Sequence, residues 1–462
     1  MILLDSDVMI DLLRRSKLLL LILAVSLLLA GCGRKAAERR PSPTETPTRP
    51  AATATLAPTA TPRPTATPTR PTATPTAEPA WLCPPATAAL TIWHLWSEEE
   101  LKAVTAIFDE YRVTCPQITL ELVSKPELDG IALETLLSKA GPDIITQRSE
   151  ELGRLAEQQA IVSLTPYLEP TFAHNYTTQA VAGVSYKGQV YGYPESLETI
   201  TLVFNRDLIN EEELPKDTDE LLRKAAAWKK TDYYLVYSAR NDAYFSAPWW
   251  QAAGVTILDD EGHTTFKSSA GYTAGNFLDA LRGLMPDNVD YTLADRLFKA
   301  GQAAMTINGP WYVAQLEQAG IHYGLHLLPV FSPTGVPAMP FVRVRYLALT
   351  RNALDRGTAE AALNVMRYYT RAEAQIRLAK MAGMIPAHVT AAADPGVTAL
   401  PVVSAFSAQA ALGKALPTSP FLGAMWDPIA QGLECIWTGA APLTTCVDRI
   451  QAAAEESIQR LK

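Results

Sequence analysis

The histidines are the side chains most suited to binding a metal or catalysing a reaction. His322 and His326 lie four positions apart, a spacing that places two zinc ligands on one face of a helix. Residues 321–328, however, have the pattern of a strand interrupted by a glycine, so we expect no metal site there. The chain also lacks the motifs H-E-x-x-H, G-x-S-x-G and G-x-x-x-x-G-K-S/T. We therefore predict that the protein is not an enzyme and that it holds no metal or cofactor.

The N-terminal residues predict export. Basic residues at 14–17 precede an apolar run at 18–29, which is short for a membrane span and typical of a signal peptide. The run ends in Leu-Ala-Gly-Cys at 29–32, which resembles the lipobox of bacterial lipoproteins, whose cysteine carries the lipid. We predict a signal peptide over residues 1–31 and a lipid anchor on Cys32, at the outer face of the cell membrane or in a periplasm. The alternative is a plain secretory signal with an incidental cysteine.

The first residues of the signal are unusual. Residues 1–13 resemble the first strand of PIN-domain nucleases, in which an Asp such as Asp5 binds metal, but a signal sequence follows at once. We interpret residues 1–8 as an over-extended start, with translation beginning at Met9.

Residues 32–80 form a predicted tether. Of the 40 residues at 41–80, 24 are Pro or Thr, a composition that cannot bury a core and favours extended chain. The remaining 382 residues carry 30 Lys and Arg against 42 Asp and Glu, a balance that argues against nucleic-acid binding.

The four cysteines beyond Cys32 predict disulfides. An even number of cysteines in an exported chain suggests two bridges, with three possible pairings. Cys83 precedes a predicted strand and Cys115 follows the helix that returns to the same sheet edge, while Cys435 and Cys446 flank a short turn between helices. We favour the pairs Cys83–Cys115 and Cys435–Cys446; the alternative is four free, buried thiols.

Short strands and amphipathic helices alternate through the rest of the chain. Residues 90–93 form an apolar strand, and Ser97 followed by three glutamates is typical of a helix N-terminus. Apolar residues then recur at helical spacing up to Tyr111. This alternation predicts an α/β fold with a mostly parallel sheet covered on both faces, whose ligand lies beyond the carboxyl ends of the strands.

Four segments resemble a known family when taken in order. They are GPDII at 141–145, GQVYGYP at 188–194 with LVFNRDL at 202–208, GQAAMTINGPW at 301–311 and GMIP at 383–386. Together they resemble the extracellular solute-binding proteins of sugar importers, with the maltose-binding proteins as the nearest type. The resemblance implies a type II periplasmic-binding-protein fold, in which two α/β lobes joined by a hinge close on a central cleft.

The resemblance also implies lobe boundaries. Lobe one would comprise residues 88–196 and 322–382, and lobe two residues 197–321 and 383–462. The hinge crossings would lie near residues 194–197, 319–324 and 383–388.

A sugar site needs aromatic rings for the sugar faces and rigid polar groups for the hydroxyls. The resemblance assigns these roles to Trp311, Trp426, Tyr244, Asp242, Glu198 and Glu150. We add Trp96, at the end of the first strand, and Trp250, after the Tyr244 loop, as further residues of the cleft.

The chain departs from the maltose-binding type at several positions. Gln147 stands where that type has a tryptophan, and Ala430 stands where it has an arginine. Arg148, Arg343 and Arg345 appear instead, and unpaired arginines would suit an acidic sugar. We count Gln147, Arg148 and Arg345 among the predicted ligand-binding residues. The alternative is that these arginines are solvated or paired with Glu150, Glu195 and Glu198.

The function that the resemblance implies is capture of a sugar or oligosaccharide by hinge closure. The receptor would be a monomer tethered by its lipid, and it would deliver the sugar to the permease subunits of an ABC importer. The alternative is a ligand-sensing or adhesive lipoprotein of the same fold without a transport role.

Overall fold

The structure is a computed structural model that describes residues 81–462, apart from 126–127, 129–130 and 132. These residues belong to one compact unit, Glu78–Lys462. The predicted signal peptide, Cys32 and the tether lie outside the described residues. Within the described part of the chain, no helix has both the length and the apolar composition needed to cross a membrane.

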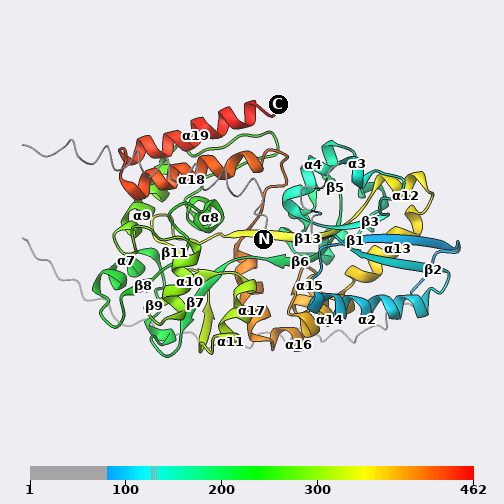
Figure 1. Ribbon diagram of the computed structural model, residues 1–462, viewed down its shortest axis with the longest axis horizontal. Helices are drawn as coiled ribbons and strands as arrows, with labels where there is room; N and C mark the ends of the chain where they lie inside the picture. The colour runs from blue at the N-terminus through cyan, green and yellow to red at the C-terminus, as the bar shows by residue number, and fades with distance from the viewer. Residues whose placement is uncertain (1–80, 126–127, 129–130, 132) are drawn as a thin grey trace, which may run out of the picture. The chain divides into compact units, whose positions relative to one another are not determined.

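A seven-stranded mixed sheet forms the frame of the first half of the unit (Figure 1). Strand β1 lies between β2 and β3 and is parallel to both, but β13 is antiparallel to β3 and to β6. The prediction of a mostly parallel sheet is therefore wrong for this half. Strand β13 enters the sheet from the other half of the molecule and runs antiparallel to its two neighbours. The strands are β1 (Ala88–His94), β2 (Ile118–Ser124), β3 (Ile144–Arg148), β6 (Tyr193–Glu198), β13 (Phe341–Leu349), β14 (Ile385–Pro386) and β15 (Lys414–Ala415).

A four-stranded sheet forms the frame of the second half. Strand β7 lies between β10 and β9 and is antiparallel to both, while β8 is parallel to β9. Its strands are β7 (Thr201–Asn205), β8 (Tyr233–Leu235), β9 (Ala303–Asn308) and β10 (Tyr323–His326). Two small hairpins accompany the sheets: β4 (Ser185–Tyr186) with β5 (Gln189–Val190), and β11 (Val330–Phe331) with β12 (Val336–Pro337).

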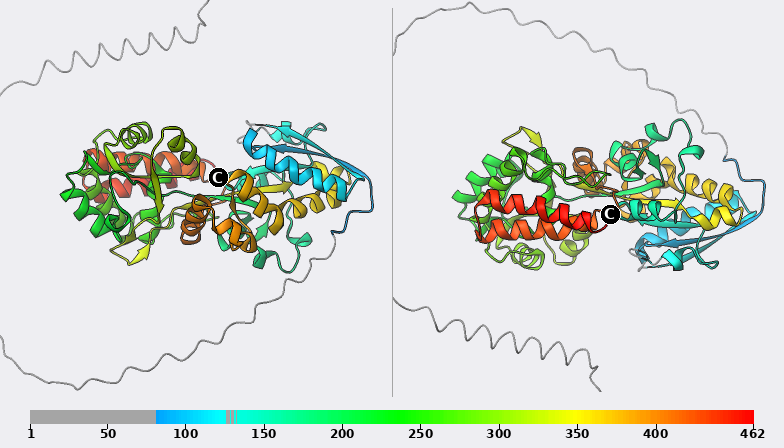
Figure 2. Two further views of the ribbon diagram at one scale, coloured as in Figure 1. Left: turned by 90° about the horizontal axis from the view of Figure 1, so that it is seen from below. Right: turned by 90° about the horizontal axis from the view of Figure 1, so that it is seen from above.

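Each half has its own hydrophobic core. The helices of the first half are α2 (Glu98–Thr114), α3 (Leu133–Leu136), α4 (Leu152–Glu157), α5 (Phe172–Asn175), α6 (Thr178–Gly183), α12 (Arg351–Asp355), α13 (Ala359–Thr370), α14 (Ala372–Ala382), α15 (Val389–Ala392), α16 (Pro395–Thr398) and α17 (Pro401–Leu412). Those of the second half are α7 (Thr218–Ala227), α8 (Ala243–Ala252), α9 (Ser269–Arg282), α10 (Tyr291–Lys299), α11 (Val313–Gln318), α18 (Gly423–Thr438) and α19 (Leu443–Gln459). Figure 2 shows α18 and α19, in red, side by side along the second half.

The chain crosses between the two sheets at places that differ in part from the prediction. The first crossing, between Glu198 of β6 and Thr201 of β7, lies close to the expected position. The second lies later than residue 322, because β10 pairs with the open edge of β7 and the chain enters the larger sheet only at Phe341. The third follows β15, because β14 pairs with β6, Phe406 of α17 packs in the first core and β15 pairs with β13.

The start of α2 agrees with the sequence analysis. Ser97 accepts a hydrogen bond from the backbone N–H of Glu100, and the Glu100 carboxylate accepts one from the backbone N–H of Ser97. This capping box satisfies two backbone donors that a helix start would otherwise leave unpaired. It also fixes the position of Glu100, which takes part in the cleft described below.

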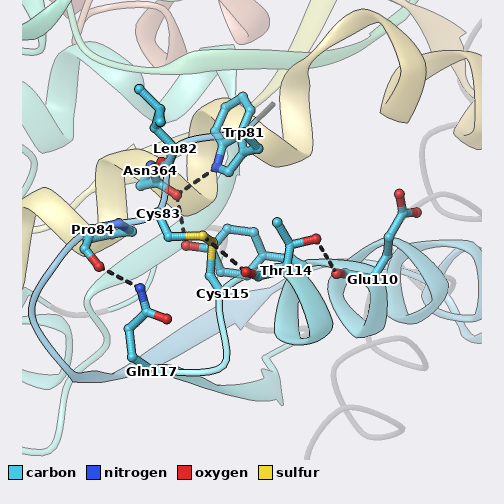
Figure 3. Close-up of a disulfide and its surroundings, with 10 residues drawn as sticks. Trp81, Leu82, Cys83, Pro84, Glu110, Thr114, Cys115, Gln117 and Asn364 are labelled. Carbon is cyan, nitrogen blue, oxygen red and sulfur yellow. Dashed lines mark hydrogen bonds between the residues drawn. A yellow bond between two sulfur atoms is a disulfide. The ribbon is translucent and has the colours of Figure 1, made fainter. Parts of the chain in front are cut away.

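The structure contains both favoured disulfides, Cys83–Cys115 and Cys435–Cys446, each with its Cα atoms 5.5 Å apart. The first belongs to an N-terminal clasp, which we define as Trp81, Leu82 and the disulfide together with Tyr111 and Asn364. Figure 3 shows the disulfide with Trp81, Leu82 and Asn364 beside it. Trp81 Nε1 and Tyr111 Oη both donate to Asn364 Oδ1 over 2.9 Å, and Asn364 Nδ2 donates to the carbonyl of Leu82 over 2.8 Å. The clasp thus fastens the first described residues to α2 and α13.

Substitution of Asn364 tests the clasp. Asn364→Ala removes three hydrogen bonds and leaves the donors of Trp81 and Tyr111 without this acceptor. We expect the free energy of unfolding to fall by about 1–3 kcal/mol in urea titrations. Asn288→Ala, at an exposed position, serves as the matched control and should change it by no more than about 0.5 kcal/mol. Equal losses in the two variants would contradict this role of Asn364.

Candidate ligand-binding cleft

Two cavities lie between residues of the first half and residues of the second. The Glu150 cavity, of about 400 Å³, is lined from one side by Glu150 and Arg343 and from the other by residues 241–244 and Trp426. The Trp311 cavity, of about 560 Å³, is lined by Arg148, Arg345 and residues 196–198 on one side and by residues 310–311 on the other. We refer to the two cavities together as the cleft.

A third cavity, of about 420 Å³, lies between α6 and residues 413–418. None of the residues predicted to bind ligand lines it, so we place the candidate site in the cleft.

Three neighbouring strands of the larger sheet bring the charged residues of the cleft together. Arg343 on β13 is paired in register with Glu198 at the end of β6. On the other side of β13, Arg345 is paired with Arg148 at the end of β3, and Glu150 follows in the next turn. This register makes residues that are 145 and 197 positions apart in the sequence neighbours in the sheet.

Arg343 bridges the two glutamates. Its Nε lies 2.8 Å from Glu150 Oε1 and its Nη1 lies 3.4 Å from Glu198 Oε2. The guanidinium also lies over the ring of Tyr244, at 5.4 Å from the ring centre. Burial raises the pKa of Glu150, against the opposing effect of Arg343. Burial alone would lower the pKa of Arg343, but the nearby Glu150, Tyr244 and Glu198 raise it, so Arg343 stays charged.

Three polar atoms beside the Glu150 cavity are buried without a hydrogen-bond partner in the described structure: Glu150 Oε2, Arg343 Nε and Tyr244 Oη. The Nε atom is close to Glu150 Oε1 but is not aligned to donate a hydrogen bond to it. Buried polar atoms without partners are costly and uncommon in native proteins. Polar atoms held in fixed positions next to an open cavity can form hydrogen bonds with the hydroxyls of a sugar.

Aromatic rings form the walls of the cleft. Trp426 and Tyr244 line the Glu150 cavity and pack against Phe341, with ring centres at 6.4 Å and 6.0 Å from it. Trp311 lines the Trp311 cavity and is 39% exposed, which leaves surface for a ligand to stack on. Its ring folds back over Gly309, where a Cβ atom would lie 2.2 Å from the ring. Glycine at 309 is thus required for this position of Trp311.

Asp242 shapes the loop beside the Glu150 cavity. It is the N-cap of α8, where its Oδ1 accepts hydrogen bonds from the backbone N–H groups of Tyr244 and Phe245 over 3.0 Å and 3.2 Å. Ser238 Oγ donates to Oδ2. Burial raises the pKa of Asp242, against these hydrogen bonds. Asp242 therefore both lines the cavity and orients Tyr244.

Arg345 is buried, and its guanidinium forms hydrogen bonds with carboxylates of the protein. It is 5% exposed; its Nε donates to Glu195 Oε2 over 2.5 Å and its Nη2 donates to Glu100 Oε1 over 2.8 Å. Trp96 Nε1 donates to the other oxygen of Glu195 over 2.6 Å, and the hydroxyl of Tyr369 donates to the same oxygen. Two helices and two strands are joined by this network.

Several predicted site residues are placed in the core. Trp96 is 4% exposed and Trp250 is fully buried, where its Nε1 donates to Ser246 Oγ. Gln147 is also fully buried, and its side chain donates to the carbonyl of Leu128. The structure gives these three residues packing roles, because each polar group already has a partner inside the protein.

The remaining predicted residues meet at the cleft. They are Arg148, Glu150, Glu198, Asp242, Tyr244, Trp311, Arg345 and Trp426. Arg343, which the sequence analysis considered with the other two arginines, lines the Glu150 cavity, and the structure adds Asn241 and Asp427 to it. Asn241 and Asp427 are adjacent to predicted residues, and that adjacency is the only signal in the sequence that could have identified them.

The family comparison matches most of the chain. A model of the family described as bacterial extracellular solute-binding protein matches residues 106–405. The chain is 26% identical over 357 residues to a maltotriose-binding protein of Pyrococcus abyssi, covering 75% of this chain and 76% of the relative. It is 22% identical over 388 residues to a galactooligosaccharide-binding protein of Bacillus subtilis, covering 79% and 89%. A maltooligosaccharide ABC transporter solute-binding lipoprotein of Streptococcus pneumoniae is 21% identical over 363 residues, covering 74% and 83%.

Solved structures establish the fold. The chain is similar to a cyclo/maltodextrin-binding protein complexed with maltotetraose, with a TM-score of 0.74, 24% identity and coverage of 81% of this chain and 98% of the other. It is also similar to the maltotriose-binding protein of Thermus thermophilus, with a TM-score of 0.63, 22% identity and coverage of 80% and 100%. The type II periplasmic-binding fold predicted from the sequence is confirmed.

The buried network around Arg345 predicts a large effect on stability. Arg345→Met removes the guanidinium that pairs with Glu195 and leaves that carboxylate buried with two neutral donors, Trp96 and Tyr369. We expect the free energy of unfolding to fall by about 3–5 kcal/mol in urea titrations. Arg460→Met, in an exposed pair with Glu456 on α19, is the control and should change it by no more than about 0.5 kcal/mol. A loss of ligand affinity by Arg345→Met without a loss of stability would show that Arg345 acts as a ligand contact instead.

Proposed function

Because the chain belongs to the family of bacterial extracellular solute-binding proteins, we propose that it captures an oligosaccharide outside the cell and delivers it to an ABC importer. Membership of a family of binding proteins also confirms the prediction that the chain is not an enzyme. The relatives named for maltotriose, galactooligosaccharides and maltooligosaccharides support an oligosaccharide as the ligand.

The observation that carries this proposal is the chemistry of the cleft. Trp426, Tyr244 and Trp311 offer aromatic surface for the faces of sugar rings, and unpartnered polar atoms lie beside the Glu150 cavity. The cavities of about 400 Å³ and 560 Å³ provide room for more than one sugar ring. One chain supplies both sides of the cleft, which supports a receptor that works as a monomer.

We propose hinge closure as the mechanism of capture. Residues of the first half and of the second half face each other across the cleft, so a ligand that contacts both sides stabilises the arrangement in which they are close. The connections between the two sheets are the elements that such a motion would bend. The permease would recognise the closed receptor, and its ATPase would be another chain.

Binding of oligosaccharides is the direct test. We expect maltotriose, maltotetraose or a galactooligosaccharide to produce a saturable change in tryptophan fluorescence and to raise the melting temperature. Trp426→Ala should weaken binding at least about tenfold, because it removes a ring that lines the Glu150 cavity. Trp228→Ala, which lies outside the cleft, should leave affinity unchanged. A panel without any response would overturn the oligosaccharide proposal and favour a sensor of another ligand.

We propose further that the receptor is held at the membrane by lipid on Cys32, through the Pro- and Thr-rich segment 32–80. The sequence at 29–32 supports this, and so does the lipoprotein named among the relatives. Cys32→Ser should move the protein from the membrane fraction to the soluble extracellular fraction and abolish incorporation of labelled palmitate. Membrane retention of Cys32→Ser at the wild-type level would contradict the anchor. Cys83→Ser/Cys115→Ser is the control for the loss of cysteines and should remain in the membrane fraction.

The alternative function is a ligand-sensing or adhesive lipoprotein. A ligand-dependent increase in uptake of the labelled oligosaccharide, lost on deletion of the gene, favours transport. Binding without such uptake favours sensing.

A further inference from the structure

The arginines of the cleft are the feature that bears on the charge of the ligand. Arg343 has a carboxylate on each side, Glu150 and Glu198. Arg345 likewise has two, Glu195 and Glu100. The positive charge of each of these arginines is therefore balanced by the protein, with one negative charge in excess in each group of three.

The lining of the cleft as a whole is acidic. Three guanidiniums, those of Arg148, Arg343 and Arg345, face six carboxylates, which gives the cleft a formal charge of −3. The carboxylates are those of Glu99, Glu100, Glu150, Glu198, Asp242 and Asp427. An anionic ligand entering the cleft would be desolvated next to this excess of negative charge.

The hydrogen-bonding atoms point to the same class of ligand. Glu150 Oε2 is buried, accepts no hydrogen bond in the described structure and lies beside the Glu150 cavity. It needs a donor from the ligand, which a sugar hydroxyl provides and a ligand carboxylate does not. The Arg343 guanidinium beside it is held by Glu150 and Glu198, so an incoming carboxylate would have to compete with two carboxylates already in place.

We infer that Glu150 and Glu198 determine the specificity of the cleft by neutralising Arg343, so that it accepts uncharged oligosaccharides and rejects acidic ones. This inference rests on the proposed function and adds to it the class of sugar. The sequence left two interpretations open: arginines available to an acidic sugar, or arginines paired with glutamates. The inference favours the second interpretation for Arg343 and Arg345.

Conversion of both glutamates to glutamine tests the inference as a change of specificity. Glu150→Gln/Glu198→Gln keeps the size and polarity of the side chains but leaves Arg343 without its two counter-charges. The probes are maltotriose and galactotriose, each compared with a derivative in which the terminal C6 hydroxymethyl is oxidised to a carboxylate. The measured quantity is the ratio of the two dissociation constants within each pair, obtained from fluorescence titrations of the full-length protein.

The expected results are distinct for each protein. The wild type should bind the neutral sugar at least about 100-fold more tightly than its acidic derivative, since opposing like charges in a binding site are strongly unfavourable. The double variant should reduce this ratio at least about tenfold. Glu198→Gln alone should reduce it less, because Glu198 lies farther from Arg343 than Glu150 does, at 3.4 Å against 2.8 Å. Higher ionic strength should lower the wild-type ratio.

A matched control separates the local effect from that of net charge. Glu134→Gln/Glu360→Gln changes the formal charge by the same amount at two exposed positions outside the cleft and should leave the ratio unchanged within about twofold. If the double cleft variant does not fold, the single variant Glu198→Gln and the wild-type ratio still decide the question.

The outcomes distinguish the inference from the function on which it rests. Binding of a neutral sugar with equal affinity for its acidic derivative overturns the inference and leaves the proposed function standing. A ratio that does not change in any of the glutamine variants overturns the role of Glu150 and Glu198. Failure of both neutral sugars and both derivatives to bind the wild type overturns the proposed function and, with it, the inference.

Discussion

Pairing of arginine with glutamate along β13 is the constraint on which the cleft depends. An arginine that is as buried as Arg345 is tolerated only where carboxylates balance its charge and accept its hydrogen bonds. Glu195 comes from β6 and Glu100 from the first turn of α2, so satisfying one guanidinium fixes the relative positions of two strands and a helix. The same strand presents Arg343 two residues earlier, on the same face, between Glu150 and Glu198. The buried group around Arg345 and the group around Arg343 in the candidate cleft are thus both presented by β13.

Much of the fold could be predicted because the signals were local. The capping box at Ser97 and the helical spacing up to Tyr111 depend on residues close in sequence, and α2 forms where they indicate. The pairs Cys83–Cys115 and Cys435–Cys446 followed from the expected positions of strands and helices. The crossings after residue 320 did not follow from local patterns. They depend on which sheet edge accepts a short strand, and β10 and β14 each pair with a strand that is far away in the sequence.

The candidate site could be predicted less fully, because it too depends on contacts between residues that are far apart in the sequence. A tryptophan that follows a strand can pack in the core or stack on a ligand, so its position alone does not tell which role Trp96 or Trp311 takes. The partner decides between the two roles: Trp96 donates to Glu195 inside the first half, whereas Trp311 folds over Gly309 and stays exposed. Arg343 and Arg345 differ from each other in a similar way. Whether their charges are free or balanced depends on glutamates at 100, 150, 195 and 198. Strand register brings Glu195 and Glu198 close, whereas the first turn of α2 places Glu100 and the turn after β3 places Glu150.

The N-terminal clasp has a mechanical consequence for a chain held at its N-terminus. All of its hydrogen bonds and its disulfide lie within the first half, on α2 and α13, and none involves the segments that join the two sheets. A load applied to residue 81 is therefore transmitted to α2 and α13 of the first half and not to the connections between the two sheets. If the receptor is anchored and closes as proposed above, tension in the chain that precedes the clasp would not oppose the motion of the second half.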